Sequence, residues 1–145
     1  MKLAIGCDEA AYDLKVEIIK HLKSRNIEVT DFGADAGVAV LYPDIGIKVA
    51  EAIARGDFER GILLCGTGIG MSISANKVPG IRAAVCHDPY SAERSRKSNN
   101  AQIMCMGARV IGVELAKYLV DIWLNCNFSG GGSTAKVKRI MEYEN

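Results

Sequence analysis

Residues 64–70 are Leu64-Cys65-Gly66-Thr67-Gly68-Ile69-Gly70, a glycine-rich turn that directly follows the apolar stretch 60–64. Three glycines at alternating positions permit positive φ and expose successive backbone N–H groups, so the turn is predicted to bind an oxyanion. A tight turn from strand to helix, without a ligand, is the alternative. The turn is not a dinucleotide fingerprint, because Met71 stands where that motif needs a glycine, and it lacks the lysine of a P-loop.

Short apolar stretches and helical patterns alternate on both sides of this turn. Strands are predicted over residues 3–7, 27–32, 60–64, 81–86 and 103–106. Helices are predicted over residues 10–25, 71–77, 89–98 and 113–125, and a further helix is predicted to begin after Asp44 as its N-cap. Strands separated by helices indicate a parallel sheet that is covered on both faces. We therefore predict an α/β protein, with residues 1–145 forming a single three-layer αβα Rossmann-like domain around a five-stranded parallel sheet. Ligands are expected at the carboxyl ends of the strands.

The segment 129–133, Ser-Gly-Gly-Gly-Ser, separates a last charged helix, ending near Tyr143, from the preceding elements. This helix could pack on its own domain or on a partner subunit, and the pattern favours neither.

Composition restricts the classes of function. The chain has 145 residues, 49% of them hydrophobic, which is enough for the core of one domain. Its 18 Lys and Arg nearly balance 17 Asp and Glu, so nucleic acid and membrane surfaces are not expected partners. The five cysteines form no CxxC pair and predict reduced thiols in a cytoplasmic protein. The first apolar run stops at Asp8 and is too short for a signal segment.

Asp8 and Cys65 follow or end predicted strands, which places them at the same edge of the sheet. A thiol at Cys65 would face the site, where N–H dipoles favour its thiolate, and could take a proton from carbon. The other four cysteines are interpreted as small buried hydrophobic residues. Helix capping explains Asp8 equally well. His87 follows the fourth strand and could reach this edge, whereas His21 is predicted to lie on the surface.

Several segments together resemble one family. They are Gly6-Cys7-Asp8, Tyr42-Pro43-Asp44, the run 61–77, Gly80-Ile81-Arg82-Ala83 and matches that continue through residues 90–116. With these motifs the chain resembles the ribose-5-phosphate isomerase B family, whose superfamily includes galactose-6-phosphate isomerase subunits. The resemblance implies an aldose–ketose isomerase without a metal or cofactor, which works through a cis-enediol intermediate. It also implies a homodimer or homotetramer whose active sites are shared between subunits.

The resemblance further implies roles for individual residues. Cys65 would move a proton between the first two carbons of the open-chain sugar, and Thr67 would assist proton transfer between the oxygens. The substrate-binding residues would be Asp8, Glu9, Tyr42, Gly66, Gly68, Ile69, Gly70, Ser98, Asn99, Arg109 and Lys136. Asn99 and Arg109 would come from the neighbouring subunit.

The chain departs from the family pattern where phosphate and ring are recognised. Glu9 and Ser98 stand where the family usually has histidines, the second of which is thought to open the furanose ring. Gly132 and Lys136 stand where it has arginines, and a lysine supplies a point charge instead of a bidentate fork. Glu9 at a phosphate site would repel the dianion.

These departures leave the substrate open. Ribose 5-phosphate and ribulose 5-phosphate form the default pair. The alternatives are a tetrose or hexose phosphate, an unphosphorylated sugar, or a non-catalytic sugar-binding subunit. An acyclic four-carbon sugar phosphate would need no ring-opening acid; otherwise Asp8 or His87 would open the ring.

Overall fold

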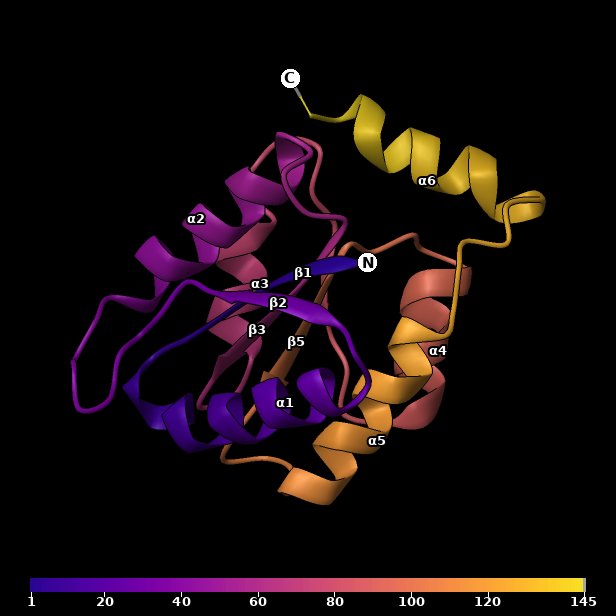
Figure 1. The fold of residues 1–145 in the computed structure, drawn as a ribbon. Coiled ribbons are helices and arrows are strands. Elements are labelled where there is room, and N and C mark those ends of the chain that lie inside the picture. Colours follow the sequence, from indigo (N-terminus) through magenta and orange to yellow (C-terminus); the bar gives the residue numbers. More distant parts are fainter. Residues whose placement is uncertain (145) are drawn as a thin grey trace.

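The computed structural model describes residues 1–144, which form a parallel sheet of five strands between layers of helices (Figure 1). The strands are β1 (Lys2–Cys7), β2 (Glu28–Asp31), β3 (Arg60–Cys65), β4 (Ala83–Val85) and β5 (Ile103–Gly107). Their order in the sheet is β2-β1-β3-β5-β4, and every neighbouring pair is parallel. The predicted fold class, α/β with a five-stranded parallel sheet, is confirmed.

The helices follow the strands in the predicted order. They are the 3-10 turn η1 (Glu9–Ala11), α1 (Tyr12–Ser24), α2 (Tyr42–Ala54), α3 (Ile69–Ala75), α4 (Pro89–Lys97), α5 (Val113–Leu124) and α6 (Gly132–Glu142). Figure 1 shows α1 and α5 on one side of the sheet, and α2 and α3 on the other.

Successive residues of each central strand enter different cores. In β3, Ile62 and Leu64 belong to the core under α1 and α5, whereas Leu63 and Cys65 belong to the core under α2 and α3. This alternation follows from the two-residue period of a strand, and both faces are apolar because helices cover both. Burying a large apolar side chain in either core contributes about 2 kcal/mol. The period therefore fixes the side of the sheet on which the Cys65 thiol lies.

The chain changes direction between β1 and β3. After β1 it adds β2 on one side, and it then crosses over to add β3 on the other side. The Asp8 N–H donates to the Leu64 carbonyl at 3.2 Å, so the carboxyl ends of these two strands lie side by side. Such a switch point leaves a crevice between the loops that follow the two strands.

Several element boundaries differ from the prediction. Helix α3 spans Ile69–Ala75 instead of residues 71–77, so Ile69 and Gly70 belong to the helix. Helix α2 begins at Tyr42 with Leu41 as its N-cap, so Asp44 is a first-turn residue and not the cap. Pro43 is compatible with the first turn because its missing N–H would have no partner there. Strand β4 is shorter than residues 81–86: it begins at Ala83, and the N–H of Arg82 donates to the Gln102 side chain and not to the ladder.

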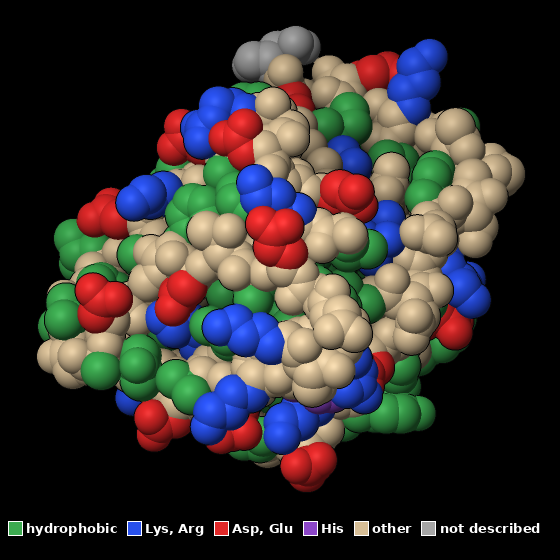
Figure 2. All heavy atoms as spheres, in the orientation of Figure 1, with side chains coloured by type: hydrophobic (Ala, Val, Ile, Leu, Met, Phe, Trp, Pro, Cys, Tyr) green, Lys and Arg blue, Asp and Glu red, His purple; other side chains and the backbone are tan. Residues whose placement is uncertain are grey.

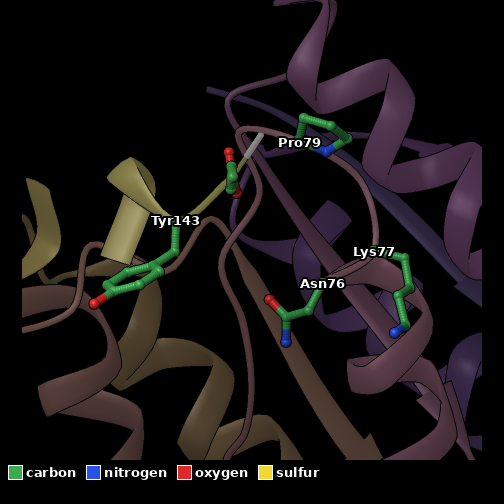
Figure 3. Close-up of a pocket in the computed structure, with 5 residues that line it drawn as sticks. Asn76, Lys77, Pro79 and Tyr143 are labelled. Atoms are coloured by element: carbon green, nitrogen blue, oxygen red, sulfur yellow. The ribbon is translucent and has the colours of Figure 1, made fainter. Parts of the chain in front are cut away.

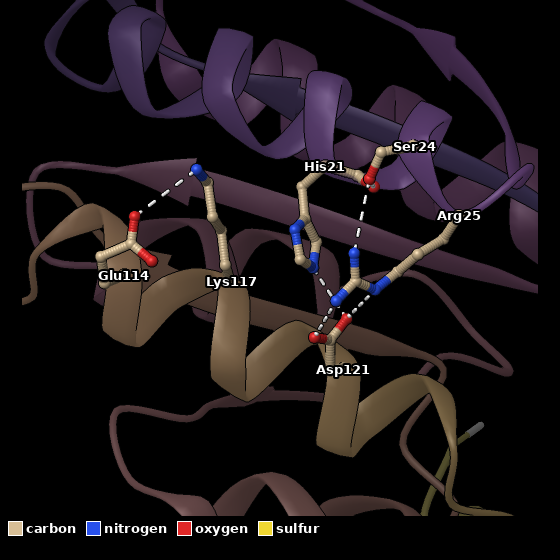
Figure 4. Close-up of polar contacts among 6 residues, drawn as sticks. All are labelled: His21, Ser24, Arg25, Glu114, Lys117 and Asp121. Atoms are coloured by element: carbon tan, nitrogen blue, oxygen red, sulfur yellow. Dashed lines mark hydrogen bonds and ion pairs between the residues drawn. The ribbon is translucent and has the colours of Figure 1, made fainter.

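His21 was predicted on the surface, and this prediction is wrong. Its side chain is only 10% exposed, and its Nε2 lies 2.7 Å from a carboxylate oxygen of Asp121 on α5. Arg25 also binds Asp121, and Lys117 lies near Glu114, so polar contacts line the seam between α1 and α5 (Figure 4). The amphipathic pattern of α1 does not reveal that α5 covers this position.

The last helix, α6, contacts its own chain through its second half. The Met141 sulfur lies 3.0 Å from Nη1 of Arg82, and the Gly80 N–H donates to Glu144 at 2.8 Å. A hollow of about 500 Å³ remains between the end of α6 and the turn after α3, with Tyr143 and Asn76 at its rim (Figure 3). Of the two placements left open by the sequence, packing on its own domain is therefore the one seen within the chain.

Candidate active site

A cavity of about 210 Å³ opens at the carboxyl ends of β1 and β3. Its lining residues are Asp8, Tyr42, Cys65, Gly66, Thr67, Gly70 and Arg109. All seven belong to the set that the family resemblance assigns to the active site. They come from four segments of the chain, and the switch point of the sheet brings these segments together.

Cys65 is the last residue of β3 and is only 5% exposed. Its Sγ accepts a hydrogen bond from the Gly68 N–H at 3.0 Å, and the Thr67 Oγ1 accepts one from the Ile69 N–H at 3.2 Å. Because Gly68 has a φ of 80°, the backbone reverses sharply and turns its N–H back to the sulfur. The two predicted catalytic side chains are thus held against the N–H donors of the turn.

The alternating glycines of the turn have two different roles. Only Gly68 uses positive φ. A Cβ on Gly66 would lie 3.2 Å from Nη1 of Arg109, and one on Gly70 would overlap the ring of Tyr42. One glycine of the turn, Gly68, is therefore needed for its positive φ. The other two are needed because they leave room for Arg109 and Tyr42, whose side chains form the cavity walls.

Gly107 is a site residue that the sequence reasoning did not single out. A Cβ there would lie 2.6 Å from the Cα of Thr67, so only glycine lets the turn pass so close to the end of β5. Two hydrogen bonds fasten the turn at this place: Ala108 N–H to the Cys65 carbonyl at 2.9 Å and Arg109 N–H to the Gly66 carbonyl at 3.0 Å. The glycine directly before Ala108 and Arg109, at the end of a predicted strand, was the available signal.

Asp8 has both of the roles that were left open. Its Oδ1 accepts the Ala11 N–H at 3.2 Å and caps η1, and the residue also lines the cavity. Burial raises the pKa of Asp8, against the lowering effect of the Ala11 hydrogen bond; the charge of Glu9 raises it further and Arg109 lowers it. A partly desolvated carboxyl at a cavity wall can exchange protons or bind sugar hydroxyls.

Neither histidine lines this cavity. His87 Nε2 accepts the Gly107 N–H at 2.8 Å, so the neutral ring carries its proton on Nδ1. Burial lowers the pKa of His87, with Asp88 opposing this effect, which favours the neutral form that the hydrogen bond requires. His87 therefore supports the end of β5, and His21 lies on the α1–α5 seam.

Six other predicted substrate-binding residues do not line the cavity of their own chain: Gly68 and Ile69, which belong to the turn beside it, and Glu9, Ser98, Asn99 and Lys136. Ser98 and Asn99 follow α4, which returns the chain to the amino end of the sheet before β5 begins, and Asn99 borders a separate cavity beside β4. Lys136 is exposed on α6. The Glu9 carboxylate instead accepts the Val40 N–H at 3.1 Å.

Arg109 was expected to reach the site from a neighbouring subunit. This detail is wrong: Arg109 lines the cavity of its own chain, with its guanidinium against Gly66. The reason is local, since Arg109 follows β5 at the same sheet edge where Cys65 ends β3.

Within residues 1–144, no cluster of three or more His, Cys, Asp or Glu is arranged as a metal site. None of the described helices combines the length and apolar character needed to cross a membrane. Basic and acidic side chains alternate over the face drawn in Figure 2, so local geometry has to hold any anionic ligand there.

Comparison with known proteins agrees with this geometry. The family model described as Ribose/Galactose Isomerase matches residues 3–140. The chain belongs to this family. It is therefore an aldose–ketose isomerase of the ribose-5-phosphate isomerase B type, as the resemblance predicted. This isomerase is 59% identical to a protein of Listeria innocua named ribose-5-P isomerase B, over 99% of this chain and 97% of that protein.

Two further relatives bear on the substrate and on the fold. D-erythrulose-4-phosphate isomerase of Pectobacterium atrosepticum is 56% identical to this isomerase, over 99% of this chain and 95% of that protein. The structure of Clostridium thermocellum ribose-5-phosphate isomerase B has a TM-score of 0.97 and 52% identity, covering 99% of this chain and 97% of that chain. Relatives of similar identity thus carry the names of two different sugar-phosphate substrates.

Proposed function

We propose that this isomerase interconverts an aldose phosphate and the corresponding ketose phosphate, with ribose 5-phosphate and ribulose 5-phosphate as the default pair. The observation that carries the proposal is the Cys65 sulfur, which lies at the N–H donors of the turn inside a cavity that Asp8, Tyr42 and Arg109 also line. Proton transfer at carbon needs a base that lies next to donors for the developing oxyanion, and this turn supplies both.

The reaction balances without an oxidant or reductant. The Cys65 thiolate takes the proton from C2 of the open-chain aldose, and the electron pair moves to give an enediolate with its charge on O1. N–H groups of the turn stabilise that charge. The Thr67 hydroxyl carries the proton of O2 to O1, and the Cys65 thiol returns its proton to C1. The C2–H bond is broken and a C1–H bond is formed.

A second copy of the chain completes the phosphate site in this proposal. Arg109 is the single basic residue in the lining of the cavity, and one Arg is a weak site for a phosphate dianion. Asn99 and Lys136 do not line the cavity of their own chain, so in this proposal a symmetric partner supplies them. The functional unit is thus a homodimer or a homotetramer. A cytoplasmic location fits the five free cysteines.

A four-carbon sugar phosphate is the second candidate substrate. It cannot close a furanose through its phosphorylated terminal oxygen, so it needs no ring-opening acid. Neither His21 nor His87 lines the cavity, and serine occupies position 98, where the family usually has the ring-opening histidine. The 56% identity to the D-erythrulose-4-phosphate isomerase of Pectobacterium atrosepticum supports the same candidate.

The test compares sugar phosphates of four, five and six carbons in one assay. Purified protein is incubated in D₂O with D-erythrulose 4-phosphate, ribose 5-phosphate or galactose 6-phosphate, and product and deuterium at C1 and C2 are followed by mass spectrometry. The highest kcat/KM for ribose 5-phosphate supports the default pair, and the highest value for erythrulose 4-phosphate supports the second candidate. Binding without any exchange of deuterium would contradict the isomerase assignment and favour a sugar-binding subunit.

A further inference from the structure

Glu9 connects two segments of the chain that line the active-site cavity. It directly follows Asp8, which lines one wall, and its Oε2 accepts the backbone N–H of Val40 at 3.1 Å. Val40 lies two residues before Tyr42, which lines the other wall. One exposed carboxylate thus joins the segment that carries Asp8 to the segment that carries Tyr42.

The loop of residues 33–41 is firmly attached at its beginning. The Cys7 N–H donates to the Gly33 carbonyl at 2.7 Å, and the Ala34 N–H donates to the Cys7 carbonyl at 2.8 Å. The buried Lys15, 1% exposed, binds the Ala34 carbonyl at 2.6 Å and the Asp31 carboxylate at 2.9 Å. The start of the loop therefore needs no help from Glu9.

The end of the same loop depends on Glu9. Within the described chain, the Val40–Glu9 contact is the one hydrogen bond that joins residues 35–40 to another segment. Leu41 is 75% exposed and offers little packing of its own. Tyr42 is the first residue of α2, and its ring lies against Gly70; the hydrogen bond from Val40 to Glu9 holds the segment that leads into it.

We propose that Glu9 is a positioning residue that fixes the distance between the Asp8 wall and the Tyr42 wall, and thereby selects the chain length of the sugar phosphate. The inference rests on the proposed function, since it names what determines the substrate of that site. Hydrogen bonds that the carboxylate accepts from Glu9's own backbone N–H and from the Val40 N–H lower the pKa of Glu9, so the accepting carboxylate persists down to mildly acid pH.

This role differs from the one that the family resemblance implied. A residue that binds or repels phosphate acts through its charge, whereas a residue that holds Val40 acts through an oxygen that accepts a hydrogen bond. Glutamine keeps the oxygen and removes the charge; alanine removes both. The pair of substitutions Glu9→Gln and Glu9→Ala therefore separates the two roles.

The experiment uses the full-length wild-type protein, Glu9→Ala, Glu9→Gln and the control Glu28→Ala. Glu28 is an exposed carboxylate on β2 that makes no side-chain contact with the loop. Amide hydrogen exchange of residues 35–42 is measured together with kcat and KM for erythrulose 4-phosphate and ribose 5-phosphate. Exchange of β5 residues serves as the check that each variant keeps its core.

We expect Glu9→Ala to speed exchange at residues 35–42 and to raise KM for the preferred substrate roughly three- to tenfold, the range for loss of one hydrogen bond. Its kcat should stay within about twofold, because Cys65 and Thr67 lie in a separate turn. The ratio of kcat/KM between the two substrates should shrink. Glu28→Ala should behave like the wild type, and Glu9→Gln should keep the loop exchange and the substrate ratio of the wild type.

Two results would overturn the proposal. If Glu9→Gln changes KM as much as Glu9→Ala does, Glu9 acts through its charge. If Glu9→Ala leaves both loop exchange and the substrate ratio unchanged, Glu9 positions nothing. Failure of the wild type to isomerise either sugar would instead contradict the proposed function, and loop exchange in Glu9→Ala would still decide whether Glu9 holds the loop.

Discussion

The turn after β3 and the segment after α4 both carry residues that the family resemblance assigns to one reaction, yet they lie at opposite ends of the sheet. Cys65 and Thr67 converge on the cavity of their own chain, whereas Asn99 borders a different cavity. In a parallel α/β fold, a residue at the end of a strand lies at the ligand edge, and a residue at the end of the next helix lies at the opposite edge. The proposed proton-transfer groups therefore lie together in one chain, whereas Asn99 would need a second chain to join them in the proposed shared site.

The largest effect is expected at the thiol. Cys65→Ala should lower kcat by about 100- to 10,000-fold, because it removes the group proposed to take the proton from carbon. Solvent deuterium incorporation at C1 and C2 measures this directly. Cys86→Ala is the matched control, since Cys86 is also buried but does not line the active-site cavity. Unchanged exchange in Cys65→Ala would show that another group moves the proton.

A smaller but still large effect is expected at the end of β5. Gly107→Ala should lower kcat about 100-fold with the fold retained, because its Cβ would push the Thr67 segment away by a fraction of an ångström. Gly112→Ala is the control, because a Cβ there meets no heavy atom within 4 Å. Equal kcat values for the two variants would mean that the position of the turn does not matter for catalysis.

A moderate loss of activity is expected at Asn99, and mixed oligomers should reverse it in a characteristic way. Asn99→Ala should lower kcat/KM about tenfold through the loss of a substrate hydrogen bond. Mixed oligomers of Cys65→Ala with Asn99→Ala should regain activity, because one of the two sites in each heterodimer contains both native residues. Random pairing of the two chains restores about one quarter of wild-type activity. Activity that merely equals the average of the two parents would place Asn99 outside a shared site.

The smallest effect concerns stability. Because burial raises the pKa of Asp8 above its ordinary value of 3.8, the folded state holds the Asp8 proton more tightly than the unfolded state does. The resulting stability is present below pH 3.8 and is lost as pH rises through the raised pKa. Asp8→Asn keeps the capping oxygen and removes the desolvated charge, so it should slightly raise the thermal midpoint at neutral pH while activity falls.

Thermal melts of the wild type and Asp8→Asn across this pH range provide the measurement. The difference between their midpoints should vanish in acid. If the thermal midpoint of Asp8→Asn instead falls at neutral pH, the Asp8 charge stabilises the fold. That result would contradict the destabilising effect that the burial of Asp8 predicts.

Periodicity in the sequence was enough to predict the order of strands and helices, because each of these elements is formed by neighbouring residues. The position of Cys65 directly between a predicted strand and the glycine turn likewise placed its thiol beside that turn, and the chemistry of a thiol near N–H dipoles followed from residues 64–70 alone. The order of strands across the sheet was not predictable in this way, because β5 comes between β3 and β4 through long-range pairing.

What the sequence by itself determined is the part of the site that one strand and its turn create: Cys65, Thr67 and the backbone donors between them. Tertiary structure decided which distant side chains join that turn. It brought Arg109 to the cavity of its own chain, engaged the ring of His87 with Gly107, and turned Glu9 toward Val40. Local patterns are governed by residues a few positions apart, whereas these contacts depend on how crossovers stack separate segments at one edge of the sheet.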